Sequence, residues 1–130
     1  MIVIDSSVWI DYFKEEDSPG GLKLNRLLLI KADIAILPII LTEVLMGFKD
    51  DKSFSQARSV IQKVPLLTPR IDTYVQAAAL FRHLRKHGLT IRGSIDCIIA
   101  QSCIESEALL ATLDKDFKAI AKHSRLQLFQ

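Results

Sequence analysis

Short apolar runs alternate along the chain with segments whose apolar residues recur every three or four positions. The first pattern is typical of strands buried on both faces, and the second of helices that pack one face against a core. The predicted strands cover residues 1–5, 33–38, 64–68, 108–113 and 126–129. The predicted helices cover residues 7–15, 22–31, 43–48, 55–63, 71–87, 95–105 and 116–122.

This alternation is the pattern of a parallel sheet with helices packed against it, an α/β fold. The chain has 130 residues and shows no internal repeat, low-complexity segment or long linker. We therefore expect one domain spanning residues 1–130. In the 64–68 run, Pro65 indicates an edge strand or a strand start, because proline cannot donate a ladder hydrogen bond.

Glycine, proline and small polar residues mark where the predicted helices begin and end. Residues 18–21 (Ser-Pro-Gly-Gly) predict a break before the second helix, and Gly88 predicts a stop after the longest one. Thr42, Ser94 and Asp116 are predicted to cap the helices that follow them.

Hydrophobic residues make up 49% of the chain and charged residues 25%, which is an ordinary globular balance. No apolar stretch is long enough to span a bilayer, and no secretory signal pattern is visible, so we expect a cytoplasmic protein with no membrane association. Cys97 and Cys103 lie in one predicted helix at a spacing that suits neither a disulfide nor a zinc pair. We expect both to be small core residues.

Four acidic residues stand just past apolar runs or near the start of predicted helices: Asp5, Glu43, Asp96 and Asp114. In open parallel sheets ligands bind beyond the carboxyl ends of the strands, so these side chains are expected to converge there. Two carboxylates about 4 Å apart repel by roughly 4 kcal/mol at an effective dielectric constant near 20. A divalent cation offsets that repulsion, and oxygen ligands suit Mg²⁺ or Mn²⁺.

Each acid also has a purely structural interpretation. Asp5 and Asp114 suit turns after strands, whereas Glu43 and Asp96 suit the first turn of a helix, where the dipole favours negative charge. For Asp116 the helix cap is the preferred interpretation. The joint pattern arises by chance far less often than any single member, which favours a shared site.

Two hydroxyl residues lie close in sequence to these acids. Ser7 follows Asp5 by two positions and can donate to a carboxylate or to a metal-bound water; it also suits a helix N-cap. Thr112 precedes Asp114 by two positions and is predicted to orient that carboxylate. A metal site of this kind activates water for attack on a phosphate ester.

A basic run precedes Asp96 and consists of Arg82, His83, Arg85, Lys86, His87 and Arg92. Positive charge beside a carboxylate pocket suits a polyanionic substrate. The same residues suit a solvated helix end, where cations interact favourably with the macrodipole. The sequence supports both interpretations equally.

No other nucleophile or phosphate-binding loop is apparent in the sequence. Ser6 and Ser7 belong to no G-x-S-x-G elbow, and residues 5–9 (Asp-Ser-Ser-Val-Trp) stand where a dinucleotide-binding fold carries G-x-G-x-x-G. The histidines lie in basic segments and are not expected to serve as ligands or bases: His83, His87 and His123.

Four motifs occur in order and together cover essentially the whole chain. They are residues 4–10 (IDSSVWI), 42–47 (TEVLMG), 91–100 (IRGSIDCIIA) and 112–117 (TLDKDF). The set resembles the PIN domain, and within it the VapC toxins of bacterial type II toxin–antitoxin modules. Ser7 is a departure, since many relatives carry Asn there, but both side chains are small and polar.

This resemblance implies a three-layer α/β/α domain with a central parallel sheet of four to five strands. It implies a Mg²⁺-dependent endoribonuclease, with Mn²⁺ as the alternative ion, acting on transfer or ribosomal RNA. The family's catalytic roles fall on Asp5, Glu43, Asp96 and Asp114, and Asp5, Asp96 and Asp114 match metal ligands. Asp116, Ser7 and Thr112 are supporting residues, and the basic run supplies candidate RNA-binding residues: Arg82, Arg85, Lys86 and Arg92.

The resemblance also implies inhibition by a VapB-like antitoxin and a homodimer. Trp9, Ile10, Tyr12 and Phe13 give the first helix an aromatic surface, and aromatic anchors favour interfaces. Core packing explains Trp9 and Ile10 equally well, so Tyr12 and Phe13 are the predicted antitoxin contacts.

Two other classes of protein fit parts of the pattern. A non-catalytic PIN-fold module would use the same basic run to bind RNA or protein, and would not cleave RNA in Mg²⁺ or Mn²⁺. A phospho-acceptor signalling domain also gathers acids at strand ends, but it needs an aspartate after the middle strand. Here the 64–68 run leads into Thr68-Pro69.

Overall fold

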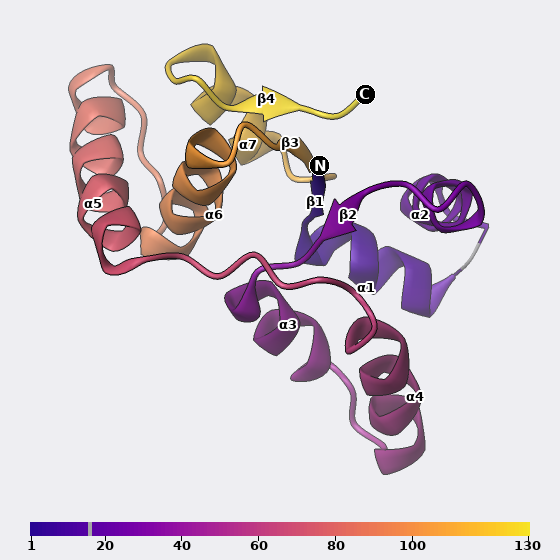
Figure 1. Ribbon diagram of the computed structural model, residues 1–130. Coiled ribbons are helices and arrows are strands. Elements are labelled where there is room, and N and C mark those ends of the chain that lie inside the picture. The colour runs from indigo at the N-terminus through magenta and orange to yellow at the C-terminus, as the bar shows by residue number, and fades with distance from the viewer. Residues whose placement is uncertain (16) are drawn as a thin grey trace.

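A parallel four-stranded sheet runs through the middle of the computed structural model, which describes residues 1–15 and 17–130 (Figure 1). The strands are β1 (Ile2–Ile4), β2 (Ile34–Ala35), β3 (Leu109–Ala111) and β4 (Gln127–Leu128), in the spatial order β2-β1-β3-β4. The α/β class and the four-stranded parallel sheet are therefore confirmed.

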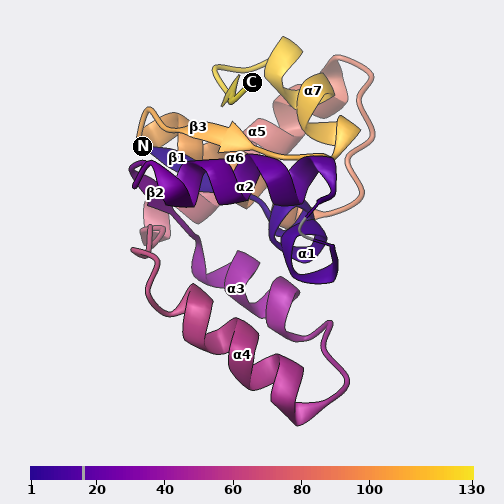
Figure 2. The same cartoon turned by 90° about the vertical axis from the view of Figure 1, so that its right-hand side faces the viewer.

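Helices flank this sheet on both sides. Helices α1 (Ser6–Lys14) and α2 (Pro19–Leu29) pack together on one side, and α5 (Ile71–Lys86) and α6 (Ser94–Glu105) on the other (Figure 1). Helices α3 (Pro38–Leu45) and α4 (Asp51–Ile61) extend beyond the sheet, as Figure 2 shows, and α7 (Lys115–Lys122) connects β3 to β4.

The predicted strand over residues 64–68 is wrong as an extended element. It contributes one isolated parallel bridge between Leu66 and Ile36. The carbonyl of Pro65 accepts a hydrogen bond from the Ile36 N–H, and the Leu67 N–H donates to the Ile36 carbonyl. Because Pro65 has no N–H, the ladder cannot extend on that side, and a bridge remains where the sequence predicts a strand.

Two predicted helix starts are corrected by the structure. Residues 18–21 open α2 rather than interrupt the chain: Ser18 is the N-cap and accepts from the Gly21 N–H at 3.1 Å, with Pro19 at the first helical position. Proline suits that position because its missing N–H has no helical partner there. Helix α4 likewise begins at Asp51, ahead of the predicted start at residue 55, and its N-cap Asp50 accepts a hydrogen bond from the Ser53 N–H.

The predicted caps Thr42, Ser94 and Asp116 are also wrong. Helix α3 begins at Pro38, so Thr42 lies inside it. Ser94 is the first residue of α6, and the N-cap is Gly93. Asp116 lies in the first turn of α7, and its N–H donates to the true cap, Asp114, at 2.9 Å.

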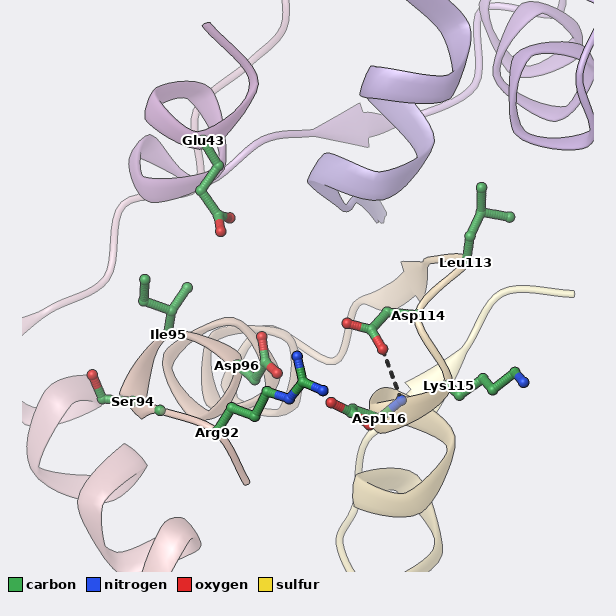
Figure 3. Close-up of a pocket in the computed structure, with 10 residues that line it drawn as sticks. Glu43, Arg92, Ser94, Ile95, Asp96, Leu113, Asp114, Lys115 and Asp116 are labelled. Carbon is green, nitrogen blue, oxygen red and sulfur yellow. Dashed lines mark hydrogen bonds between the residues drawn. The ribbon is translucent and has the colours of Figure 1, made fainter. Parts of the chain in front are cut away.

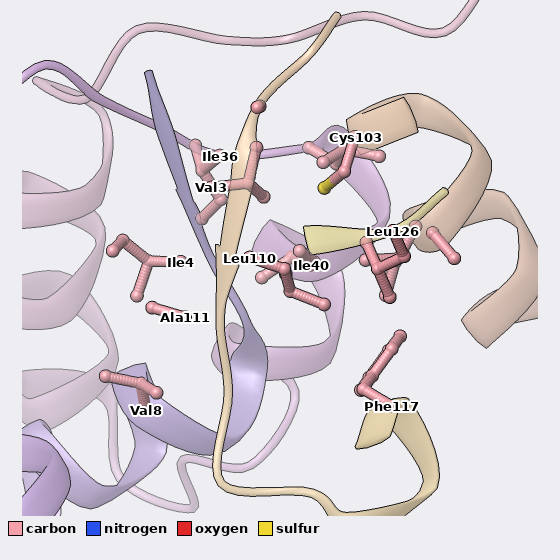
Figure 4. Close-up of a cluster of buried hydrophobic side chains, with 14 of the residues drawn as sticks. Val3, Ile4, Val8, Ile36, Ile40, Cys103, Leu110, Ala111, Phe117 and Leu126 are labelled. Atoms are coloured by element: carbon pink, nitrogen blue, oxygen red, sulfur yellow. The ribbon is translucent and has the colours of Figure 1, made fainter. Parts of the chain in front are cut away.

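Large apolar side chains fill the space between the sheet and its helices. Trp9 of α1 and Phe117 of α7 are among the largest fully buried side chains, and Figure 4 shows Phe117 in the cluster around β1 and β3. Cys97 and Cys103 are buried and form no disulfide, which confirms their predicted role as core residues. Within the described residues, no helix combines the length and the apolar character that a bilayer crossing requires.

Candidate functional site

The sheet brings two of the predicted acids to one edge. β1 pairs with β3 in parallel, with Ile4 opposite Ala111, so both strands end at the same level. Asp5 follows β1 directly, and its N–H donates to the Ala111 carbonyl at 2.9 Å. Asp114 follows β3 after a short link and caps α7. Parallel strands that end together place their following residues at the same edge.

Two helices bring the other two acids to this edge. Asp96 lies in the first turn of α6, and Glu43 in the second turn of α3, because that helix begins at Pro38. Figure 3 shows both side chains directed into a shared cavity that Asp114 also faces. The cavity has a volume of about 810 Å³ and is lined by Glu43, Arg92, Gly93, Ser94, Ile95, Asp96, Leu113, Asp114, Lys115 and Asp116.

Asp5 is held in place by two hydroxyl groups. Its Oδ2 accepts hydrogen bonds from Ser7 Oγ and from Thr112 Oγ1, each at 2.8 Å. Those hydroxyl oxygens accept in turn from the Leu113 N–H and the Asp114 N–H, each at 3.0 Å. Asp5 is 4% exposed and does not line the cavity. The network ties the end of β1 to the segment that follows β3.

Two predictions about Ser7 and Thr112 are corrected by this hydrogen-bond network. Ser7 donates to a carboxylate as predicted, but the N-cap position of α1 belongs to Asp5. Thr112 orients the Asp5 carboxylate rather than that of Asp114, whose backbone N–H it accepts. Both hydroxyl groups therefore fix the same carboxylate.

Three carboxylates form a group that could hold one cation. One oxygen from each of Asp96, Asp114 and Asp116 lies within 4.8 Å of the other two, a spacing at which one cation can bind all three. Asp116 is thus a closer member of the cluster than its sequence interpretation as a cap suggests. Asp5 and Glu43 lie outside this group of three, yet the charge of Asp5 acts on both Glu43 and Asp96.

Within the described residues, no lysine or arginine forms an ion pair with the carboxylates of the cluster. Burial, followed by the charges of Asp114, Asp5 and Asp116 in that order of importance, raises the pKa of Asp96 to about 6. Burial, followed by the charges of Asp5 and Asp96, also raises the pKa of Glu43. Both shifts have the sign expected for carboxylates that share a partly desolvated pocket.

Two further observations suit a bound cation. The Glu43 Oε1 atom is buried and has no hydrogen-bond partner among the described residues. Across residues 1–15 and 17–130, the ion pair within 4.0 Å is that of the Met1 amino group with Asp33, so no lysine or arginine pairs with the acids of the cluster. Carboxylate oxygens are the ligands that hard divalent cations prefer, and an oxygen without a hydrogen-bond donor is free to bind one.

The predicted RNA-binding residues are placed in different surroundings. Arg92 lines the acidic cavity, and Arg82 lines a neighbouring cavity between α5 and α6. Arg85 stacks over the Phe81 ring at 5.5 Å, and Lys86 is exposed; neither lines these two cavities. Lys115, which the sequence did not single out, also lines the acidic cavity. Its position between Asp114 and Asp116 is the signal that would have found it.

Comparison with known proteins places this arrangement in a family. Residues 2–123 match the family model described as PIN domain. This chain belongs to the PIN domain family. Ribonuclease VapC11 of Mycobacterium tuberculosis and VapC ribonuclease Mb1587 of Mycobacterium bovis are both 34% identical to this PIN domain over 131 residues. Each match covers 98% of this chain and 96% of the relative, which confirms the VapC-type resemblance.

Solved structures share the fold of this PIN domain. VapBC2 from Rickettsia felis, bound to a DNA fragment from its promoter, has a TM-score of 0.80 at 21% identity and covers 99% of this chain and 98% of that chain. VapC20 of Mycobacterium tuberculosis, a toxin that cleaves the sarcin–ricin loop, has a TM-score of 0.69 at 16% identity, with 97% and 98% covered. At these identities the likeness supports the fold.

Proposed function

We propose that this PIN domain is a metal-dependent endoribonuclease toxin that hydrolyses RNA phosphodiester bonds. The observation that carries the proposal is the uncompensated carboxylate cluster at the carboxyl edge of β1 and β3. Asp96, Asp114 and Asp116 bring oxygen atoms within 4.8 Å of one another, and no protein cation pairs with them in the described residues. The ribonuclease names of the 34% identical relatives support the same activity.

The residues of the cluster suit Mg²⁺, with Mn²⁺ as the alternative. Asp96 and Asp114 would hold the cation together with Asp116, while Asp5 and Glu43 add negative charge beside them. A divalent cation held there makes a water molecule easier to deprotonate and offsets charge on the phosphate oxygens. Ser7 and Thr112 keep the Asp5 carboxylate fixed, so that its charge does not move during the reaction.

Positive groups at the rim suit the substrate. Arg92 and Lys115 line the same cavity as the acids, and neither is tied to a carboxylate by an ion pair within the described residues. Both are exposed and can contact phosphates on either side of the bond that breaks. Transfer RNA and ribosomal RNA remain the predicted substrates, as the family resemblance implies, and the single-stranded loops of such RNAs leave bases accessible.

A protein inhibitor and a second copy of the chain complete the proposal. Solved relatives include toxin–antitoxin complexes such as VapBC2 of Rickettsia felis, which supports a VapB-like antitoxin here. Tyr12 and Phe13 are partly exposed on α1, next to the buried Trp9, and stay the predicted antitoxin contacts. A homodimer and a cytoplasmic location are the remaining parts of the proposal.

Cleavage of RNA by purified protein tests this function. We expect wild-type protein to cut single-stranded RNA in Mg²⁺ or Mn²⁺, and Asp96→Asn to reduce the rate at least about a hundredfold, because a ligand of the cation is lost. Asp72→Asn, an exposed acid on α5, is the matched control and should keep full activity. RNA that is bound but left intact by wild-type protein in both metals would favour a non-catalytic module instead.

A further inference from the structure

A second cavity lies beside the acidic one, between α5 and the start of α6. It has a volume of about 550 Å³ and is lined by Tyr74, Ala77, Ala78, Phe81, Arg82, Ile91, Arg92, Gly93, Ser94 and Ile98. We call it the α5–α6 groove. Its walls are mainly apolar, whereas the neighbouring cavity is acidic.

The groove and the acidic cavity adjoin each other. Arg92, Gly93 and Ser94 line both of them, so this short segment forms the ridge between the two. Figure 3 shows Arg92 and Ser94 at the start of α6, next to the acid Asp96. An RNA strand with a phosphate beside the acids therefore has an apolar space next to that phosphate.

The composition of the groove suits a base of a single-stranded nucleic acid. Tyr74 is 49% exposed and Phe81 is partly exposed, so aromatic surface is available for stacking. Ala77 and Ala78 are small, which keeps the wall formed by α5 open. Unstacked bases bind to aromatic side chains without much dependence on sequence, and arginines beside them contact the backbone.

The charged residues around the groove indicate which kind of molecule it can bind. Among the residues that the structure describes, the charged side chains that line the groove are Arg82 and Arg92, and both are exposed. No acidic residue in the described part of the chain lines the groove to pair with a basic partner. An apolar slot rimmed by two arginines is complementary to a base attached to a phosphate backbone, and it is poorly complementary to a cationic protein surface.

We propose that the α5–α6 groove binds the base of a nucleotide next to the scissile phosphate, with Tyr74 stacking on that base and Arg82 contacting its backbone. This inference rests on the proposed ribonuclease function and adds a binding site that selects flexible, unpaired RNA. A base held in a stacked double helix cannot enter the groove, so paired RNA is a poor substrate.

Substrate and protein changes test the groove together. The substrate is a single-stranded RNA oligonucleotide that wild-type protein cleaves, compared with copies that carry one abasic nucleotide on either side of the cut. With wild-type protein, we expect one of the two abasic substrates to raise KM about tenfold at nearly unchanged kcat, because stacking is lost. We expect the Tyr74→Leu variant to show the same change in KM with the intact RNA. Tyr74→Phe should restore the wild-type KM, and Phe54→Leu on α4 is the matched control.

A binding measurement separates the groove from the catalytic proposal. The probe is RNA with 2-aminopurine at the position where the abasic nucleotide raises KM, or at each position in turn. It is titrated with protein in excess chelator. We expect wild-type protein to quench the fluorescence. Quenching that is weaker for both Tyr74→Leu and Arg82→Ala, but unchanged for the α4 variant Arg58→Ala, supports binding in the groove even if no RNA is cleaved. Failure to cleave overturns the proposed function alone.

Two results would overturn the groove. One is a Tyr74→Leu variant that binds and cleaves abasic and intact RNA as the wild type does. The other is sedimentation of Tyr74→Leu as a monomer under conditions where the wild type is a dimer, which would show that a second copy of the chain covers this surface.

Discussion

Replacing Asp96 with asparagine should stabilise the fold while it abolishes cleavage. The pKa of Asp96 rises from 3.8 to about 6 through burial and through the charges of Asp114, Asp5 and Asp116. The native protein therefore holds this carboxylate in an unfavourable charged state at neutral pH. Asparagine keeps the size and shape of the side chain and removes the charge.

The magnitude follows from the difference between the two pKa values. At about 1.4 kcal/mol for each pKa unit, the change from 3.8 to about 6 corresponds to roughly 3 kcal/mol. Asp96 is only partly buried, so solvent screens part of this interaction, and about half of the figure, roughly 1.5 kcal/mol, is the reasonable expectation. For a chain of this size that is a rise in Tm of about 5 °C.

The effect depends on pH with a definite sign. Below pH 3.8 the side chain is protonated in both the folded and unfolded states, so it causes no loss of stability. Between pH 3.8 and about 6 the unfolded state gives up its proton first, and wild-type stability declines relative to Asp96→Asn. Above about pH 6 the difference is constant.

Urea unfolding of both proteins in chelator at pH 4 and pH 7.5 measures this directly. We expect nearly equal free energies of unfolding at pH 4 and a more stable Asp96→Asn at pH 7.5. Adding Mg²⁺ at pH 7.5 should narrow the gap, because the cation stabilises the wild type alone. An Asp96→Asn variant that is as stable as, or less stable than, the wild type in chelator at pH 7.5 would refute the reasoning.

Three other predictions concern the surroundings of the cluster. Thr112→Val should lower the cleavage rate about 10–100-fold at unchanged fold, as judged by circular dichroism, because Asp5 loses a donor at 2.8 Å. Burial raises the pKa of Cys97 to about 11 and that of Cys103 to about 12, so neither thiol should react with a thiol reagent at pH 8 until urea unfolds the protein. Ser18→Ala should lower the free energy of unfolding by about 1 kcal/mol in urea titration, because α2 loses its N-cap, and an unchanged midpoint would contradict this.

The shared edge of Asp5 and Asp114 could be predicted from the sequence because strand direction determines it. Asp5 and Asp114 each follow a buried strand, and parallel strands end at one edge. The hydroxyl network around Asp5 was less accessible to that reasoning. Thr112 lies 107 positions from Asp5, and only the register of β1 against β3 brings its hydroxyl to that carboxylate.

Helix starts were harder to predict, because several residues near each start can serve as the cap. Asp114 and Asp116 both suit a cap by residue type, and the end of β3 decides in favour of Asp114. Pro38 starts α3 earlier than Thr42 suggests, which moves Glu43 into the second turn. Glu43 still faces the cavity, since the whole helix begins at the same edge of the sheet.

Binding of Mn²⁺, followed by electron paramagnetic resonance of the free ion, tests whether the acids form one cation site. The measurement compares wild-type protein with Asp96→Asn, Asp114→Asn and the exposed control Asp72→Asn. We predict saturable binding by the wild type and the control, with a large loss of affinity in both cluster variants. Equal binding by all four proteins, or none by the wild type, would contradict the account.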